Sequence, residues 1–445
     1  GGAGDDTLDG GEGSDWLYGG AGDDVIDGGA GFDRIDFRES TSSVVVDFSA
    51  GTAAGAAIGS DKISNIERVI GSNFDDTLTG SNTENDVWES FTGGLGDDII
   101  DGAGGNDYVW YGRSDAGIHV DLETGTVTGG EGEDQLTSIE WVAGSNFADI
   151  LLGSEGDDGF SPDALGDDGA GSNFKVGGAD IIDGKGGVDT VSYNNTGTKD
   201  GFSPSGIIAN LAVGEVTDQA GNVDKLSNIE NITGSAYNDN IIGDENANVL
   251  RGEDGNDTLE GNAGDDTLDG GSGNDTLDGG AGDDIISDGL GNDTLRGGAG
   301  NDTFINYGNT DTFDGGEGTD RLFTKLDDEY IASIGLIEKQ FTVGLNLETG
   351  QHGQFDTTNL QFTGVGLDTL ISVEDFEISG NFDIYAIGDS NANTIIGDEG
   401  NDTIDGGAGD DTLDGGAGIN ILNGGKGDDT YQFAHQGIDT ITDIS

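Results

Sequence analysis

The chain has 445 residues, of which 87 are glycine, and its 89 acidic and 15 basic side chains give a formal net charge of -74. Self-repulsion on this scale destabilises a compact state unless cations neutralise it. It excludes a nucleic-acid partner, which needs a basic surface, and no stretch reaches the ~18 apolar residues of a membrane span.

The sequence divides into alternating blocks, which we interpret as one elongated all-β solenoid. Glycine-rich repeats alternate with longer segments in which apolar residues alternate with polar ones, as in strands. The expected order is repeats over 1–36, a strand-rich insert over 37–80, repeat coils over 81–110, a second insert over 111–153, a loop and coils over 154–192, a third insert over 193–242, a long repeat block over 243–323, a fourth insert over 324–387 and repeats over 388–445.

The repeats keep a period of nine residues. From Gly243 to Phe323 the unit follows the pattern G-G-x-G-x-D-x-U-x, in which U is a large apolar residue. Position six is Asn248 in the first unit and aspartate in the others. Position eight is always apolar: Leu250, Leu259, Leu268, Leu277, Ile286, Leu295, Phe304, Phe313 and Leu322. A register held over consecutive units indicates a repeated structural element.

The four inserts resemble one another. Each has an alternating strand, at Val44–Phe48, Ile118–Leu122, Ile207–Leu211 and Val343–Leu347, followed by a D-x-[IL]-x-x-[IV]-E-like stretch, at Asp61–Glu67, Asp134–Glu140, Asp224–Glu230 and Asp368–Glu374. Two interruptions carry the only prolines, in the shared tetrapeptide GFSP at Gly159–Pro162 and Gly201–Pro204. We interpret them as surface loops, and Lys325–Gln340 as a place for a short helix.

The unit has the chemistry of a calcium-binding turn. Glycines let six residues turn tightly, and the next three form a short strand whose middle side chain points inward. Two units make a coil of 18 residues, so Asp257 should face Asp275 and Asp266 should face Asp284. Calcium takes six to eight oxygen ligands, which aspartates and glycine-loop carbonyls supply, whereas magnesium demands a tighter octahedron. Position-five residues such as Asp265, Asn256 and Asn274 should face solvent or brace the turn.

The repeats closely resemble the RTX calcium-binding nonapeptide family, with full matches such as Gly270–Asp278 and Gly406–Asp414. The resemblance implies a parallel β-roll with many calcium ions held between successive turns. The predicted aspartate ligands are Asp6, Asp15, Asp24, Asp33, Asp98, Asp107, Asp180, Asp189, Asp239, Asp257, Asp266, Asp275, Asp284, Asp293, Asp302, Asp311, Asp320, Asp402, Asp411 and Asp429. The predicted carbonyl ligands are those of Gly2, Gly4, Gly20, Gly22, Gly271, Gly273, Gly280, Gly282, Gly407 and Gly409.

Calcium should also determine whether the chain folds. Each coil buries only two large apolar side chains, cysteine is absent, and stacked carboxylates repel one another, so folding and calcium binding should be one event. The asparagines at position six, Asn248, Asn393 and Asn420, should weaken the sites that include them. His119, His352 and His435 are too scattered to form a site for softer metals.

Two functions fit this chemistry. The first is a structural segment of a secreted surface-layer, matrix or adhesin-type protein, exported through type I secretion and folded by external calcium, with self-association or surface polysaccharide as its partner. The second is the calcium-dependent tail of a secreted protease, lipase or epimerase, although the chain has no H-E-x-x-H or G-x-S-x-G motif. We expect no catalysis within the chain, and no ice binding, since position three lacks a threonine row. Because both ends fall inside repeats, we expect a segment of a longer protein.

Overall fold

A computed structural model describes residues 1–82, 88–163, 177–194, 205–307, 310–325, 342–347, 351–356, 361–362, 368–371, 374–379, 383–397, 399–433 and 437–442. These residues form strands, bridges and turns and no helix. In the part described, therefore, no helix has the length and hydropathy needed to span a bilayer. The contacts divide the chain into two units, Gly1–Ser205 with Val213–Ile232 and Gly206–Ala212 with Thr233–Ser445.

The first unit consists of two sheets and a small strand pair. The first sheet contains β2 (Thr7–Glu12), β5 (Val25–Ala30), β7 (Val44–Asp47), β8 (Thr52–Gly55), β9 (Gly59–Ser64), β11 (Thr77–Thr79), β13 (Ile99–Asp101), β15 (Ile118–Asp121), β16 (Thr126–Gly129), β17 (Gly132–Thr137), β19 (Ile150–Leu152), β21 (Ile181–Asp183), β24 (Glu215–Thr217) and β25 (Val223–Ser227). The second contains β3 (Trp16–Leu17), β6 (Arg34–Asp36), β10 (Arg68–Ile70), β12 (Trp88–Thr92), β14 (Asn106–Trp110), β18 (Trp141–Ala143), β20 (Gly159–Ser161), β22 (Thr190–Ser192) and, where the unit ends, β26 (Asn231–Thr233). The small pair is β1 (Gly2–Ala3) with β4 (Gly20–Ala21).

The second unit has the same two-sheet plan. Its strands in the first sheet are β23 (Ile208–Asn210), β27 (Asn240–Ile242), β29 (Thr258–Ala263), β31 (Thr276–Ala281), β33 (Thr294–Ala299), β35 (Thr312–Glu317), β37 (Thr342–Asn346), β38 (Gln351–Asp356), β39 (Gln361–Phe362), β40 (Asp368–Ile371), β42 (Asp383–Ile387), β44 (Glu399–Gly400), β45 (Thr403–Asp405), β47 (Ala417–Asn423) and β49 (Gly437–Ile441). Those in the second sheet are β28 (Val249–Arg251), β30 (Thr267–Asp269), β32 (Ile285–Ser287), β34 (Thr303–Asn306), β36 (Arg321–Lys325), β41 (Asp375–Ser379), β43 (Thr394–Ile396), β46 (Thr412–Asp414) and β48 (Thr430–Gln432).

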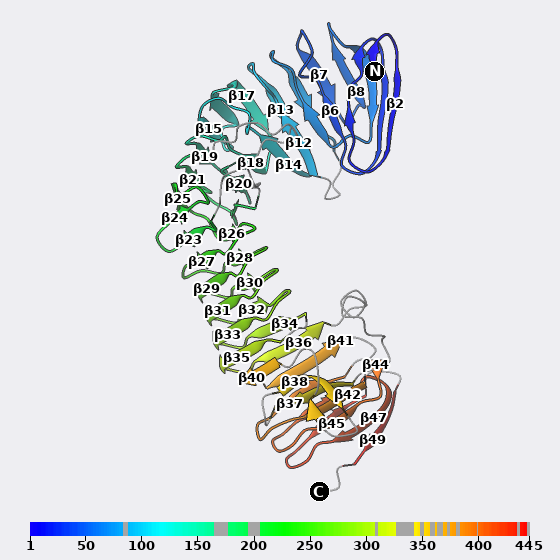
Figure 1. Cartoon of the computed structure of the whole chain (residues 1–445), viewed down its shortest axis with the longest axis vertical. Helices are drawn as coiled ribbons and strands as arrows, with labels where there is room; N and C mark the ends of the chain where they lie inside the picture. Colours follow the sequence, from blue (N-terminus) through cyan, green and yellow to red (C-terminus); the bar gives the residue numbers. More distant parts are fainter. Residues whose placement is uncertain are drawn as a thin grey trace. The chain divides into compact units, whose positions relative to one another are not determined.

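Successive nonapeptides enter the two sheets in turn, and each coil stacks in parallel on the one before it. Leu259 of β29 pairs with Leu277 of β31, 18 residues later, and Leu268 of β30 pairs with Ile286 of β32 in the opposite sheet. Figure 1 shows β29, β31 and β33 in one row and β30, β32 and β34 in another. The all-β parallel roll and its 18-residue coil are thus confirmed.

The core is a narrow double column of position-eight side chains. Leu259, Leu277 and Leu295 are 0–1 % exposed, and so are the position-eight residues of the facing sheet. Their neighbours in each strand point outward, because successive side chains of a strand alternate between its faces. Where the column becomes aromatic, Phe304 and Phe313 meet edge to face at 5.5 Å between ring centroids.

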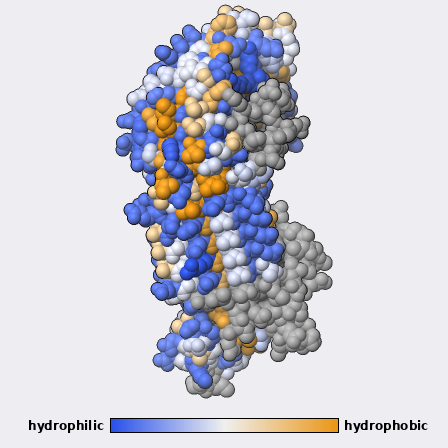
Figure 2. Space-filling model, turned by 60° about the vertical axis from the view of Figure 1, so that its left-hand side comes forward, coloured by the Kyte–Doolittle hydropathy of each residue, from blue (hydrophilic) through white to orange (hydrophobic). Residues whose placement is uncertain are grey.

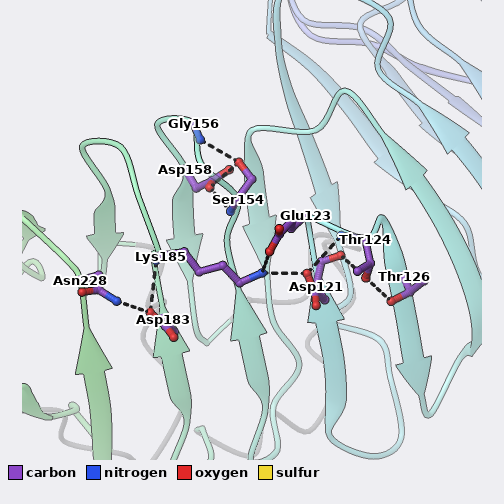
Figure 3. A network of polar contacts seen from close by, with 10 residues as sticks. All are labelled: Asp121, Glu123, Thr124, Thr126, Ser154, Gly156, Asp158, Asp183, Lys185 and Asn228. Carbon is purple, nitrogen blue, oxygen red and sulfur yellow. Dashed lines mark hydrogen bonds and ion pairs between the residues drawn. The ribbon is translucent and has the colours of Figure 1, made fainter.

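In each insert the antiparallel strands lie in the first sheet. In the first insert, β9 pairs in parallel with β5, β8 runs antiparallel to both β9 and β7, and β7 pairs in parallel with β11. The second insert repeats the plan with β17, β16 and β15, while β14 and β18 pair in parallel in the second sheet. Lys185 also fastens this insert to a neighbouring coil, donating hydrogen bonds at 3.0 Å to Asp121 and Glu123 (Figure 3).

The interpretation of the first GFSP tetrapeptide as a surface loop is wrong. Gly159–Ser161 forms strand β20, paired with β18 and β22, and Phe160 is fully buried. An aromatic residue at the inward position lets this segment continue the core column. The second tetrapeptide, Gly201–Pro204, and the expected short helix, apart from its first residue, lie outside the described residues.

The core column predicts the effect of a single cavity. We expect Leu277→Ala to cost about 2–5 kcal/mol of unfolding free energy, since Leu277 is 1 % exposed and stacked on both sides. Urea unfolding at a fixed, saturating calcium concentration measures the loss. The outward-facing Thr276→Ala is the control and should stay within about 0.5 kcal/mol of wild type; equal losses would contradict this core assignment.

Candidate metal site in the glycine-rich turns

The position-six aspartates form a hydrogen-bonded ladder along each edge of the roll. The Asp257 N–H donates to Asp275 Oδ1 at 2.7 Å, and the Asp275 N–H donates to Asp293 Oδ1 at 2.7 Å. On the opposite edge the Asp266 N–H donates to Asp284 Oδ1 at 2.8 Å. The predicted facing of residues 18 apart is confirmed. A backbone N–H thus holds the Oδ1 atom of each carboxylate, and this contact fixes the direction in which the Oδ2 atom points.

The second oxygen of most of these carboxylates is buried and has no hydrogen bond. Among the described residues, Oδ2 is buried without a hydrogen-bond partner in a set that includes Asp15, Asp24, Asp33, Asp98, Asp107, Asp180, Asp189, Asp257, Asp266, Asp275, Asp284, Asp293, Asp302, Asp320, Asp411 and Asp429. A buried carboxylate oxygen that lacks a donor is costly. A cation between the turns removes that cost.

Burial also changes the proton affinity of these groups. Desolvation is the largest cause in each case: it raises the pKa of Asp257 and Asp275 to about 7, that of Asp107 to about 8 and that of Asp180 to about 9. Neighbouring carboxylates add to the shift, as Asp239 and Asp275 do at Asp257. Without a metal ion, therefore, the turns hold protons at a pH where a solvated aspartate holds none.

Glycine at position one leaves room beside the second oxygen. A Cβ atom built on Gly252 would contact both Asp257 Oδ2 and the Gly270 carbonyl oxygen of the next coil. The same convergence occurs at Gly1, between Asp6 Oδ2 and the Gly19 carbonyl. Oxygens from two consecutive turns therefore meet where a side chain would block them. Hard oxygen donors in this arrangement fit calcium.

The predicted carbonyl ligands lie in the same turns, at positions two and four. The position-two carbonyls of Gly271 and Gly407 already accept a backbone N–H from the next coil, which leaves each with a second lone pair. The position-one carbonyls, which the sequence analysis did not single out, converge with the carboxylates. Ligation by the predicted carbonyls stays a prediction.

Position five behaves as expected. The Asn274 N–H donates to Asn256 Oδ1 at 2.7 Å, and the Asp283 N–H donates to Asp265 Oδ1 at 2.9 Å, all at exposed positions. These side chains form an outer ladder that braces the turns from the solvent side.

A second class of turn satisfies its carboxylate with protein donors. In the G-S-x-x-x-D units, the serine N–H and hydroxyl donate to the aspartate, as Ser72 does to Asp76 and Ser145 to Asp149. Ser154 and Asp158 show the same contact (Figure 3). We call these closed turns, and the turns with an unsatisfied Oδ2 open turns.

Asp239 differs from most of the predicted aspartate ligands. It belongs to a closed turn, since Ser235 donates to both of its oxygens at 2.6 and 2.8 Å and the Ile207 N–H donates to Oδ1. Serine at position two supplies the donors that an open turn lacks. Asp239 Oδ2 still converges with the Gly252 carbonyl at Gly234, so ligation by Asp239 stays a prediction. The G-S-x-x-x-D pattern at Gly234–Asp239 is the sequence signal that distinguishes this closed turn from the open turns.

The inserts end each ladder with their own acids. The Asp24 N–H donates to Asp61 and the Asp33 N–H to Glu67, at 2.9 and 2.7 Å. The other inserts provide Asp134 with Glu140, Asp224 with Glu230, and Glu374 in the same role. Sequence reasoning found this D-x-[IL]-x-x-[IV]-E stretch without recognising its purpose. The Oδ2 atom of Asp61 is buried without a hydrogen bond, which makes Asp61 a further candidate ligand.

Two buried tyrosines close the corresponding turns of the second and third inserts. Tyr111 donates its hydroxyl to Asp134 Oδ2, and Tyr193 donates to Asp224 Oδ2, both at 2.9 Å. Both rings are almost fully buried. In these two turns a phenol hydroxyl satisfies the Oδ2 atom that a cation would otherwise neutralise. Asp61 has no such donor at its Oδ2 atom.

The remaining predicted positions keep the ladder geometry. Asp311 and Asp402 are buried and accept the N–H groups of Asp293 and Ile384. The position-six asparagines are also buried. Asn248 and Asn393 use their amide oxygens to accept a position-two N–H, from Asp244 and Asp389 respectively. Weaker calcium binding at these asparagines stays a prediction.

No group of three or more His, Cys, Asp or Glu side chains is arranged as a metal site in the part of the chain that the structure describes. This agrees with a site in which each turn supplies one carboxylate and backbone carbonyls complete the shell. The residues present therefore fit calcium, which would neutralise the stacked carboxylates and link consecutive coils.

The ladder predicts a register-dependent loss of calcium binding. Asp275→Ala removes an orphaned oxygen and the acceptor of the Asp257 N–H, so we expect a loss of ~2 kcal/mol in stability at fixed calcium and weaker binding. Glu260→Ala removes a carboxylate from an exposed outward position of β29 and is the matched control. Calorimetric calcium titration compares them; similar titration curves for the two variants would argue against the site.

Acid should partly replace calcium. The folded-state pKa values are raised, so in the calcium-free chain the stability they contribute is complete below the unfolded value of 3.8 and is lost as pH rises through about 7. We expect a chain depleted of calcium by dialysis to show β-type circular dichroism near pH 4 and to lose it by pH 8. Absence of any β signal at the acid end would contradict the burial of these carboxylates.

The comparisons with known proteins agree with this geometry. The model of the RTX calcium-binding nonapeptide repeat matches more than half of the chain, at residues 1–35, 85–115, 137–164, 227–259, 242–277, 251–286, 269–304, 278–312, 287–322, 310–328, 387–422 and 411–432. No curated protein sequence matches significantly. The matched regions contain most of the open turns with their orphaned oxygens, while the open turns of Asp180 and Asp189 lie outside them. The chain therefore belongs to the family of RTX calcium-binding nonapeptide repeat proteins.

Proposed function

We propose that this chain is a calcium-folded scaffold in a cell-surface or extracellular assembly and that it catalyses nothing. Its family supports the coarser statement, a calcium-binding repeat segment of a secreted protein. The observation that carries the proposal is the pair of edges lined by orphaned carboxylate oxygens. A roll whose every coil needs cations is folded where calcium is plentiful and unfolded where it is scarce.

The roll is also suited to spanning distance. Its coils are joined by parallel strand ladders and rise about 4.8 Å each, so length grows with coil number. The narrow core of one inward side chain per strand leaves no interior for a substrate pocket in the described repeats. Rigid extension, rather than chemistry, is what this architecture provides.

An apolar outer surface in the first unit supports self-association as the way the scaffold assembles. Apolar side chains gather in one region of the face that Figure 2 presents. Ile150 and Ile181 pair on the neighbouring strands β19 and β21, lie at outward positions of the first sheet and are 36 % and 49 % exposed. In the second unit the same repeat position holds the exposed Thr258, Thr276 and Thr294. Clustered apolar residues on an outer face favour a protein partner, here a second copy of the chain.

The test of this proposal combines folding with assembly. Circular dichroism should show β structure in millimolar calcium, its loss in chelator, and no recovery in equal magnesium. In calcium, sedimentation velocity should show a concentration-dependent oligomer, which Ile150→Thr with Ile181→Thr should weaken at least about tenfold. Threonine is the residue at this position in β29, β31 and β33 of the second unit.

The control for this experiment is Ile285→Thr, which changes an isoleucine that is 44 % exposed in the second sheet of the second unit. It should leave the oligomer unchanged. A wild-type chain that stays monomeric and binds surface polysaccharide would overturn self-association. Turnover of a peptide or glycan substrate by the purified chain would overturn the scaffold proposal itself.

A further inference from the structure

Two buried aspartates outside the nonapeptide register lie close together in the first unit. Asp163 follows β20, and Asp218 follows β24 in the third insert. Neither occupies position six of a repeat, so the family's motif assigns them no role. Their relative exposures are only 6 % and 1 %.

Asp163 is the less satisfied of the two. Within the described residues, both of its carboxylate oxygens are buried and have no hydrogen bond. The backbone N–H of Gly178 acts to lower the pKa of Asp163 but does not reach hydrogen-bonding geometry at either oxygen. An isolated buried carboxylate of this kind costs several kcal/mol unless it is neutralised.

Asp218 is held in a fixed orientation by its own turn. Its Oδ1 accepts the N–H groups of Ala220 and Asn222 at 2.8 and 2.7 Å, and its Oδ2 accepts the Asn222 side-chain amide at 2.8 Å. These donors leave lone pairs on Oδ2, since an ionised carboxylate has about four acceptor sites.

Gly177 brings the two carboxylates to one point. A Cβ atom built on Gly177 would lie 2.7 Å from Asp163 Oδ2 and 2.7 Å from Asp218 Oδ2. The residue has φ = +51°, a conformation that side chains disfavour. Glycine therefore leaves open the space between two acidic oxygens, and a calcium ion with oxygen distances of ~2.3–2.6 Å can bridge them.

The second insert shows how the chain handles a comparable acid with a protein cation. Glu131 is 7 % exposed; desolvation by burial raises its pKa to about 8, and Arg113 acts electrostatically against this rise. Around Asp163, in contrast, the charged groups with the largest effect are Asp218, Asp224 and Asp149, and each raises its pKa. Among the described residues, no basic side chain is among the groups that shift the pKa of Asp163.

We propose that Asp163 and Asp218 hold a calcium ion at a site that the nonapeptide motif does not provide. The ion connects the turn after β20 to the turn after β24, so the third insert is fastened to its neighbouring coil by metal where the second uses Lys185. Backbone carbonyls or water complete its shell, as calcium allows. This proposal assumes only that the chain binds calcium. It does not require that the chain acts as a scaffold.

The sign of a stability change tests this site. In saturating calcium, Asp163→Asn should lower the thermal midpoint of the full chain by several degrees, because a ligand is lost. Native mass spectrometry should count one calcium ion fewer per chain in both Asp163→Asn and Asp218→Asn. Crystals of the calcium-loaded chain should show an anomalous peak between the two side chains.

The matched control is Glu131→Gln, which neutralises a buried acid that already has a guanidinium near it and should leave the number of bound ions unchanged. If Asp163→Asn instead raises the midpoint with the same number of ions bound, the carboxylates merely repel each other and the site is refuted. An ion that magnesium replaces at equal concentration would overturn its identity as calcium.

Discussion

The structure depends on one unsatisfied group, the Oδ2 atom of the position-six aspartate. Its partner oxygen accepts the N–H of the aspartate one coil earlier, as in Asp257 and Asp275, so the carboxylate has no freedom to turn toward water. Burial then makes it a base with a pKa near neutrality. A core of one inward side chain per strand is too small to offset this cost along a whole edge. We therefore expect cations to be part of the fold.

The inserts are compatible with the roll because their own acidic side chains accept the same backbone N–H groups that position-six aspartates accept elsewhere. Asp61 and Glu67 accept the N–H groups that the next position-six aspartates would otherwise accept. The second sheet then continues from β6 to β10 without a break. Serine and tyrosine donors take over at Asp76, Asp134 and their equivalents. An insertion into one sheet thus leaves both ladders terminated and the opposite sheet intact.

The sequence predicts the periodic part of this structure because every unit repeats the same physics. Glycine spacing, the inward position eight and the 18-residue facing of aspartates all follow from local geometry. The closed turn of Asp239 was not predicted because it depends on Ser235, a neighbour whose N–H and hydroxyl donate to the carboxylate. Phe160 was assigned to a loop because proline and glycine surround it, although its burial decides otherwise. Asp163 and Asp218 come together through tertiary contact alone, which no spacing encodes.

Open and closed turns are not mixed at random along the chain. Closed turns lie at or next to the ends of inserts, at Asp76, Asp149, Asp158 and Asp239, whereas consecutive open turns run from Asp257 to Asp302. Serine and tyrosine donors act at any calcium concentration, so the insert borders carry contacts that do not depend on the metal. Between them, we expect each coil to need cations to stack on the next. We therefore expect dependence on calcium to be strongest in the repeat runs, and the first three inserts each lead into the next run through a closed turn, at Asp76, Asp149 and Asp239.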